Sequence, residues 1–185
     1  MIDRLIKECK KNNRKAQSEL FYQYKDILFA LCLKYCSNTE EAEDILQESF
    51  VTIFKRINQY KSKGSFEGWM KRITINNAID RYRKKSFTNI QVNEELIEDT
   101  ETKINEFDFH FSLDELLQLI HELPTKYRLV FSLYELDDYS HKEISSLLKI
   151  SEGASKANLH RAKATLKAKI ESINKGRKKI TVSNG

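Results

Sequence analysis

A chain of 185 residues is long enough for two small domains or one domain of medium size. One Pro and five Gly, set against abundant Leu, Ile, Lys and Glu, favour an all-α protein with short connections and argue against a sheet. The net charge of +5 permits a polyanionic partner but does not by itself require one.

The charge is divided along the chain. Residues 1–88 carry 18 basic and 11 acidic side chains, residues 89–113 carry one and seven, and residues 114–185 carry 13 and nine. The two basic blocks suggest contact with a polyanion. Because the acidic stretch also loses helical periodicity, two small helical domains are predicted, 1–88 and 114–175, joined by a linker at 89–113. A basic tail at 176–185 follows them.

Neither a membrane segment nor a cysteine-based site is indicated. No run approaches the roughly 20 apolar residues of a membrane span, and the N-terminus lacks the apolar core of a signal peptide. Cys9, Cys32 and Cys36 are an odd number with no His near them in sequence, so they are expected to be buried free thiols. A cytoplasmic protein without membrane insertion is therefore expected.

The first predicted helix starts near Phe21 and carries apolar residues at steps of three and four as far as Tyr35. The polar cluster 37–39 supplies an N-cap for a second helix, whose first turn is acidic. The apolar stripe predicted for the second helix consists of Ala42, Leu46, Phe50, Ile53, Phe54 and Ile57. Its outer face is polar and carries Asp44, Gln47 and Glu48. By residue type alone, that face is most simply a solvated surface.

Residues 59–65 are predicted to form a basic loop that contains Lys61 and Lys63, and residues 66–85 to form a third helix. One arc of this helix, roughly 100° wide, carries Trp69, Arg72, Asn76 and Arg83. An aromatic ring, two guanidiniums and an amide on one face can stack on and hydrogen-bond unpaired bases. The alternative is that Trp69 belongs to the core and the arginines are solvated.

The acidic segment 89–113 loses helical periodicity, which predicts a flexible, solvated linker. Fully extended, its 25 residues reach at most roughly 85 Å. The two flanking domains can therefore engage separate sites at the same time.

Four further helical segments are predicted after the linker. Leu113 opens a short amphipathic helix, and Pro124 stands where the first turn of the next helix tolerates it. Residues 137–140 end that helix. Segments 141–148 and 152–170 are then separated only by three residues, which is the spacing of a helix-turn-helix motif.

The last helix could enter the major groove of DNA. Ser151 is its predicted N-cap, and residues 155–170 include five basic side chains and no acidic one. Leu159 and Ala162 can pack inward, which leaves an outer face of Lys156, Ala157, His160, Arg161 and Lys163. The alternative is a basic, solvated helix in a four-helix domain.

No catalytic constellation is present in the sequence. It contains no Gly-rich phosphate loop, no Ser-His-Asp set and no paired carboxylates beside a predicted cleft. The chain is therefore expected to need no metal or cofactor and not to be an enzyme.

Two groups of short motifs carry a resemblance to a known family. The first half contains the runs AEDILQESF (42–50), FEGWMKRI (66–73), NNAID (76–80) and RKK (83–85). The second half contains LP (123–124), YRLVF (127–131), YSHKEI (139–144), ISEGASK (150–156) and LHRAK (159–163). These runs resemble conserved regions 2 and 4 of sigma-70 family RNA polymerase sigma factors. Their order, the absence of region 3 and the chain length are similar to the extracytoplasmic function (ECF) subgroup.

The resemblance implies a factor that binds core RNA polymerase and directs transcription initiation at specific promoters. It implies polymerase contacts by Asp44, Gln47 and Glu48. It implies melting and reading of the promoter -10 element by Lys61, Lys63, Phe66, Trp69, Arg72, Asn76, Arg83 and Lys84. It implies reading of the duplex -35 element by Ser151, Lys156, Ala157, His160, Arg161 and Lys163. An anti-sigma factor is a further candidate partner.

Two positions depart from the family pattern, and one rival function stays open. Lys149 stands where the family usually has a Gly in the turn, and Ser155 stands where it usually has a packed Val. The rival is a DNA-binding regulator that uses the helix-turn-helix alone, with the first half as a dimerisation or sensing module. A nucleic-acid-processing enzyme would need a metal-binding acid cluster, and the acid-rich run 94–101 lies in the predicted linker.

Overall fold

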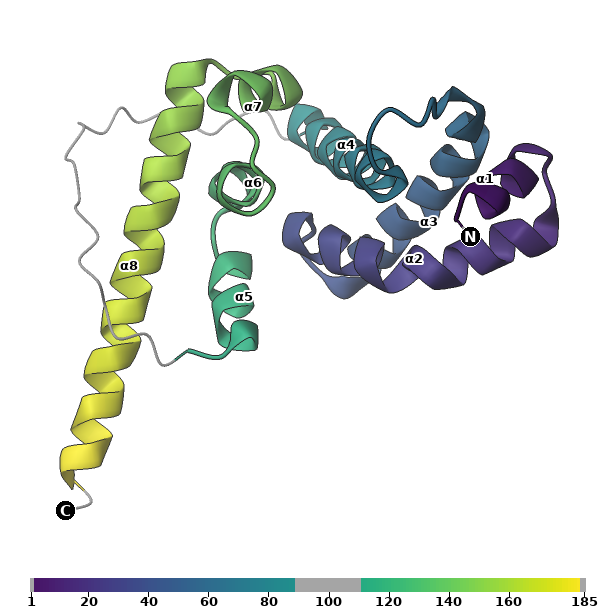
Figure 1. The fold of residues 1–185 in the computed structure, drawn as a ribbon. Coiled ribbons are helices and arrows are strands. Elements are labelled where there is room, and N and C mark those ends of the chain that lie inside the picture. The colour runs from purple at the N-terminus through teal and green to yellow at the C-terminus, as the bar shows by residue number, and fades with distance from the viewer. Residues whose placement is uncertain (1, 89–110, 184–185) are drawn as a thin grey trace. The chain divides into compact units, whose positions relative to one another are not determined.

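The computed structural model describes residues 2–88 and 111–183, and in these two stretches the chain is helical with no strand (Figure 1). The chain forms two compact units, Met1–Ile90 and Gln91–Gly185, called here the N-terminal unit and the C-terminal unit. The all-α prediction is confirmed. The predicted linker falls almost entirely outside the described residues.

The N-terminal unit is built from four α-helices and one short 3-10 turn. Their bounds are α1 Ile2–Lys10, α2 Arg14–Tyr35, α3 Thr39–Arg56, η1 Ile57–Gln59 and α4 Phe66–Thr88. The sequence pattern predicted neither α1 nor the first two turns of α2. Both are explained by local caps, because Asn12 adopts a left-handed conformation and the Asn13 side chain accepts hydrogen bonds from the first turn of α2.

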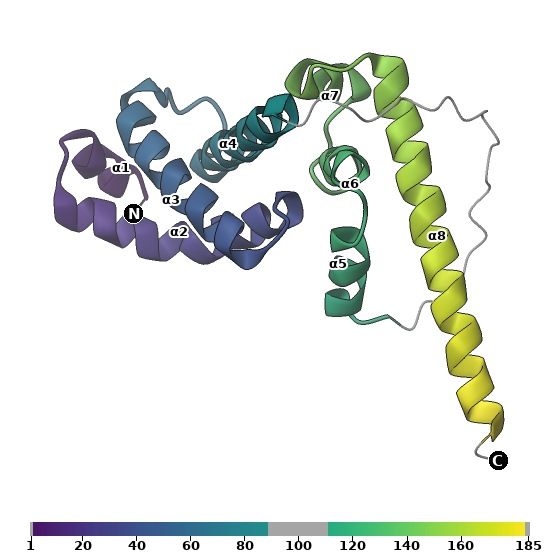
Figure 2. The ribbon, with the colours of Figure 1, turned by 180° about the vertical axis from the view of Figure 1, so that it is seen from behind.

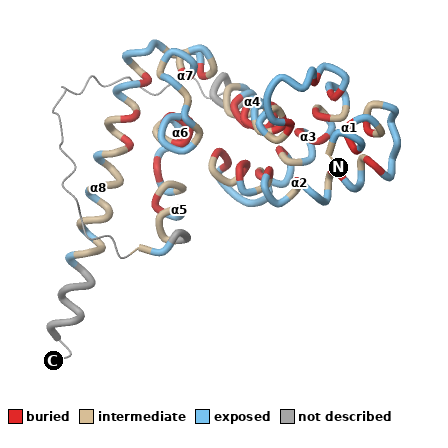
Figure 3. The backbone as a smooth tube through the Cα atoms, viewed as in Figure 1, coloured by how far each residue is buried: buried red, intermediate tan, exposed pale blue. Residues whose placement is uncertain are grey.

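The core of the N-terminal unit lies where α2, α3 and α4 pack against one another. Figure 3 shows the buried positions facing inward on these helices. Its largest fully buried side chains are Leu20, Leu28, Ile45, Ile53, Ile57, Met70 and Ile79. The three cysteines are also buried and free, as predicted.

The predicted stripe of α3 is corrected at Leu46, and Phe54 of the same stripe is also only half-buried. Ile45 is buried and Leu46 only half-buried, and Ser49 is buried as well. Periodicity cannot decide which of two adjacent apolar residues faces the core, and here the packing against α2 and α4 selects Ile45. The outer face of α3 remains as predicted.

The C-terminal unit consists of α5 Leu113–His121, α6 Thr125–Phe131, a π-helical turn η2 Ser132–Leu136, α7 His141–Leu148 and α8 Glu152–Ser183 (Figure 2). Capping boxes begin α5 at Ser112 and α7 at Ser140. Helix α8 is longer than predicted and includes residues 176–183, which the sequence set apart as a basic tail.

Helix α8 is the element against which the rest of the C-terminal unit packs. Its contacts are mainly with α6 and α7. The fully buried apolar residues among those described in this unit are Leu129, Val130, Leu133, Ile144 and Ala162. An ion pair of 2.6 Å between Lys169 and Glu122 ties α8 to the end of α5. The inner side of α8, the candidate recognition helix, is thus packed against the other helices of the unit.

None of the helices formed by the described residues is both long and apolar enough to cross a membrane.

Candidate nucleic-acid and protein interfaces

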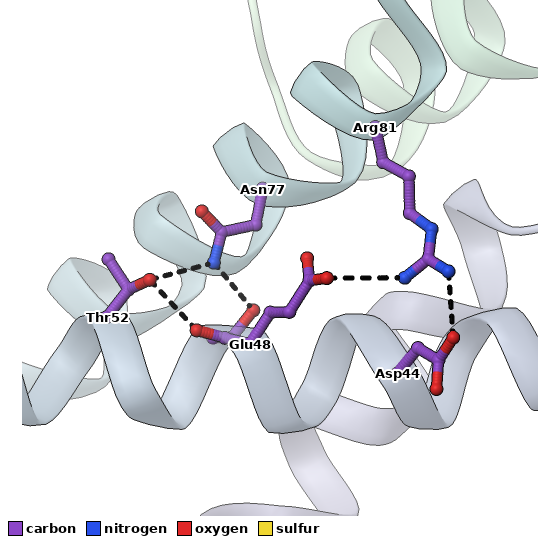
Figure 4. Close-up of polar contacts among 6 residues, drawn as sticks. Asp44, Glu48, Thr52, Asn77 and Arg81 are labelled. Carbon is purple, nitrogen blue, oxygen red and sulfur yellow. Dashed lines mark hydrogen bonds and ion pairs between the residues drawn. The ribbon is translucent and has the colours of Figure 1, made fainter. Parts of the chain in front are cut away.

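The outer face of α3 presents its predicted polar residues to solvent. Asp44, Gln47 and Glu48 are all exposed. The two carboxylates are nevertheless oriented, because Arg81 of α4 reaches across to both (Figure 4). Its Nη2 donates to Asp44 Oδ2 at 2.7 Å, and its Nη1 lies 3.6 Å from Glu48 Oε1.

A row of polar contacts continues from Arg81 along the α3–α4 interface. Asn77, one turn before Arg81, donates from Nδ2 to Ser49 Oγ at 3.2 Å and to Thr52 Oγ1 at 3.4 Å. Thr52 in turn donates to the backbone carbonyl of Glu48 at 2.8 Å. The acidic face is therefore connected to α4 at two successive turns.

The two carboxylates on α3 shift the pKa of Arg81. The hydrogen bond with Asp44 raises the pKa of Arg81, opposed by burial and reinforced by the charge of Glu48. The sequence did not single out Arg81, because its partner lies 37 residues away on another helix. Asn77 and Arg81 are polar residues one turn apart, but only the packing of the helices shows that this side of α4 contacts α3.

An aromatic cluster stands at the start of α4. Trp69 is half-buried and stacks on Phe66, with ring centroids 5.5 Å apart and an interplanar angle of 22°. Tyr60 lies 5.6 Å from the Trp69 ring and 5.0 Å from the Phe66 ring, and Tyr24 packs against the far side of the cluster. One face of Trp69 is thus supported by the core while part of the ring stays accessible.

Phe66 is the exception among the predicted DNA-facing residues. It is only 5% exposed, and its ring is enclosed by Tyr24, Tyr60 and Trp69. Phe66 is the first residue of α4, directly after the loop 60–65, and its side chain is buried in the core there. In this structure its ring supports Trp69, and its part in opening and reading the -10 element stays a prediction.

The remaining predicted residues of this surface are accessible. Lys61 and Lys63 are exposed in the loop 60–65, which Tyr60 closes by donating from its hydroxyl to the Gly64 carbonyl at 2.9 Å. Further exposed side chains on α4 are Arg72, Asn76 and Lys84. Arg83 is half-buried and pairs with Asp80 at 3.2 Å, so its charge is partly balanced within the helix.

The helix-turn-helix of the C-terminal unit is formed by α7, a three-residue turn and α8. Lys149 ends α7 in the left-handed conformation, with φ of 56°, which is the geometry that a Gly adopts most readily. Ser151 begins α8, and its hydroxyl accepts a hydrogen bond from the Ala154 amide at 3.0 Å. The predicted N-cap is confirmed.

The residues predicted on the outer face of α8 differ in how far they are exposed to solvent. Lys156 and Ala157 are exposed, whereas His160 and Arg161 are half-buried. Lys163 is also half-buried and pairs with Glu135 of the π-helical turn at 2.7 Å. The first turns of α8 are thus the most accessible part of the basic face.

A polar contact inside the motif was not foreseen. Ser155 is fully buried, and its hydroxyl lies 2.9 Å from His141 Nδ1 at the start of α7. The His141 ring also stacks on Tyr134 at 4.4 Å. Burial lowers the pKa of His141, and the charge of Lys156 adds to the effect. Where the family usually has an apolar packing residue, this chain has a Ser–His contact that links the two helices.

No group of three or more His, Cys, Asp or Glu side chains in residues 2–88 and 111–183 is arranged to hold a metal ion.

Each of the two units matches a known protein-family model. A model described as Sigma-70 region 2 matches residues 20–88, and one described as Sigma-70, region 4 matches residues 113–166. The two matches fall on the two compact units, in the order that the motifs suggested.

Similar curated proteins and one solved structure agree with these matches. The ECF RNA polymerase sigma factor SigW of Bacillus subtilis is 30% identical over 190 residues, covering 94% of this chain and 98% of that protein. The ECF RNA polymerase sigma factor SigM of the same organism is 29% identical over 152 residues, covering 81% and 92%. The structure of the sigma factor RpoE in complex with the anti-sigma factor NepR, from Bartonella quintana, aligns with a TM-score of 0.51 at 16% identity, covering 84% of this chain and 96% of that chain. At that identity it shows the shared fold.

Proposed function

The chain belongs to the ECF family of RNA polymerase sigma factors, and from this premise we propose how its two units direct the polymerase to promoters. The N-terminal unit binds core RNA polymerase and opens and reads the -10 element. The C-terminal unit reads the -35 element as duplex DNA. The polymerase supplies the chemistry, so this chain acts without catalytic activity of its own, in the cytoplasm where polymerase and DNA are found.

The polymerase contact is assigned to the outer face of α3. Asp44, Gln47 and Glu48 are exposed together there, and the two acids favour a basic partner surface. Carboxylates that accept from Lys or Arg form the stronger class of hydrogen bond. This face therefore suits a docking contact more than a packing role within the unit.

The -10 contact is assigned to the start of α4 and the loop before it. Trp69 offers a partly open ring on a rigid aromatic support, and such a ring can stack on an unpaired base. Arg72 and Asn76 lie one and two turns further along the helix and are exposed. Lys61 and Lys63 can hold phosphates beside them. Arg83 and Lys84 extend the basic surface toward the end of α4.

The -35 contact is assigned to the first turns of α8. A recognition helix reads base edges mainly with its N-terminal residues, and in α8 these include Lys156 and Ala157. Ser151 and the open amides of the first turn favour a phosphate. His160, Arg161 and Lys163 follow along the same helix, with Lys163 needing release from Glu135 before it can reach DNA.

The observation that carries the proposal is the coincidence of two family regions with two compact units in one chain. A regulator that uses the helix-turn-helix alone would not need the exposed acidic face on a second, independent unit. The fold relative from Bartonella quintana was solved with an anti-sigma factor, and a regulator of that kind is a further candidate partner here.

The test compares DNA selection with and without polymerase. Fragmented genomic DNA is incubated with the full chain alone or with the chain plus core RNA polymerase, and the retained fragments are sequenced. We expect discrete sequences to be enriched only when polymerase is present. Lys156→Ala combined with Arg161→Ala should lose this enrichment while still associating with polymerase. Equal enrichment by the chain alone would favour the helix-turn-helix regulator.

A further inference from the structure

We propose that Arg81 is a positioning residue for the polymerase-docking face: it fixes the Asp44 and Glu48 carboxylates in the orientation that the polymerase binds. This inference rests on the proposed function of that face. Arg81 itself would touch no base and need not touch the polymerase. It acts by pre-organising the two acids before the partner arrives.

The geometry of the contact supports a bridging role. A single guanidinium donates to Asp44 at 2.7 Å with one nitrogen and lies 3.6 Å from Glu48 with another (Figure 4). The hydrogen bond from Nη2 fixes the direction of the Asp44 carboxylate, whereas Glu48 accepts no hydrogen bond from Nη1 and is held near it by charge. Lys lacks the planar fork that reaches both acids at once.

The charges give a reason for the bridge. Asp44 and Glu48 stand four residues apart on α3, so two like charges are neighbours on one helix face and repel each other. Without a cation between them, the two side chains would turn apart into solvent. Arg81 reduces this repulsion and pairs with both acids from α4, while both stay exposed on α3.

The contact orients the acids without covering them. The Asp44 and Glu48 side chains each remain 60% exposed, whereas that of Arg81 is 27% exposed. Arg81 engages only Oδ2 of Asp44, and the carboxylate can accept further hydrogen bonds through its other oxygen. A cation on the partner can therefore approach while the internal pair persists, which argues against Arg81 as a competitor that must leave.

The position of Arg81 separates it from the DNA-facing side of α4. At 3.6 residues per turn, Arg81 lies roughly 140° around the helix from Asn76 and roughly 180° from Arg72. Asn77, one turn earlier on the α3 side, anchors the same strip of α4 through Ser49 and Thr52. Arg81 thus belongs to the α3–α4 contact and lies away from Arg72 and Asn76, whereas Lys84, three residues further on, is a neighbour at roughly 60°. Measuring polymerase binding without DNA keeps any effect on Lys84 out of the result.

The experiment measures the affinity of the full chain for core RNA polymerase, without DNA, for the wild type and for Arg81→Met, Arg81→Lys and Asp44→Asn. Met keeps an unbranched apolar stem while removing the charge. Since an exposed ion pair contributes at most about 1 kcal/mol, we expect Arg81→Met to weaken binding roughly three- to fivefold. Arg81→Lys should recover only part of this loss. Lys71→Ala, which breaks a 2.7 Å ion pair with Glu67 on the same helix, should bind as the wild type does.

A double-mutant cycle distinguishes positioning from general loss of structure. If Arg81 acts through both acids, Arg81→Met should add less in the Asp44→Asn background than in the wild type, and little once Glu48→Gln is present as well. Full additivity, unchanged binding or tighter binding by Arg81→Met would each overturn the inference while leaving polymerase binding by the wild type intact. A wild-type chain that does not bind polymerase would instead refute the proposed function itself.

Discussion

At the scale of single residues, the His141–Ser155 contact makes the stability of the helix-turn-helix depend on pH. Burial, followed by the charge of Lys156, lowers the pKa of His141 in the folded chain. His141 therefore binds a proton less readily in the folded state than in the unfolded state, where its pKa is near the ordinary His value of about 6.5. The contribution of His141 to stability is complete above that pH and is lost as the pH falls through the lowered pKa.

We predict that the C-terminal unit loses stability between pH 7.5 and pH 5.5, and that His141→Asn reduces this loss. Asn can still hydrogen-bond Ser155 but does not titrate. Some dependence of stability on pH should remain in this variant, because burial also lowers the pKa of His121. Thermal unfolding followed by circular dichroism measures both units, while fluorescence of the single Trp, Trp69, reports the N-terminal unit separately. An unchanged pH slope in the variant would show that His141 is not the titrating group.

Trp69 is the residue on which the proposed -10 contact depends most. We expect Trp69→Ala to reduce the equilibrium of promoter opening roughly five- to 150-fold, since one stacked base contributes about 1 to 3 kcal/mol. Binding to the closed promoter should change much less. Permanganate reactivity of unpaired thymines measures opening, and filter binding at low temperature measures the closed complex. Trp69→Phe is the matched control because it keeps a stacking ring. Equal losses in both assays would mean that Trp69 only supports the core.

At the scale of elements, the turn between α7 and α8 stores a local conformational cost. Lys149 is held at φ of 56°, and a non-Gly residue in this region costs roughly 1 to 2 kcal/mol. Lys149→Gly removes that cost but makes the unfolded chain more flexible, so a net gain of about 1 kcal/mol in the free energy of unfolding is expected.

Calorimetry of the full chain measures this gain as a higher unfolding temperature of the C-terminal unit. The same substitution in the middle of α8, Lys167→Gly, should have the opposite sign and cost about 1 kcal/mol. A destabilised Lys149→Gly variant would show that contacts of the Lys side chain outweigh its backbone strain.

The elements differ in how far local signals determine them. The bounds of α7 agree with the sequence pattern because Ser140 and Glu143 form a capping box at its start and Lys149 turns the chain at its end. The choice of Ile45 over Leu46 in the core could not be predicted, since it depends on packing against two other helices. The π-helical turn at 132–136 has no local sequence signal of comparable strength.

The same distinction holds for the candidate interfaces. The helical pattern placed Asp44, Gln47 and Glu48 on a polar face opposite an apolar stripe, but only the family resemblance assigned that face to the polymerase. Phe66 was placed with the DNA-facing residues by family resemblance, and only the fold shows that its ring supports Trp69 from within. Arg81 and His141 act through partners on other helices, so periodicity along one helix could not reveal them.

At the scale of the whole molecule, two compact units carry different kinds of surface. The N-terminal unit combines an exposed face on α3 that carries Asp44 and Glu48 with an aromatic and basic face at the start of α4. The C-terminal unit presents a basic recognition helix. A factor that must hold a polymerase and touch two separated DNA elements needs these three surfaces in one chain, and a duplex-binding regulator needs only the last.

The measurement that tests this account most directly is transcription by purified core RNA polymerase on genomic templates, with RNA 5′ ends mapped by sequencing. With the wild-type chain, we predict initiation at discrete sites that polymerase alone does not use. Asp44→Ala combined with Gln47→Ala should abolish these starts while lowering the unfolding temperature of the N-terminal unit only slightly, because both side chains are exposed and the Asp44–Arg81 ion pair contributes at most about 1 kcal/mol. Initiation that does not depend on the chain, or that persists in full with the double variant, would contradict the account.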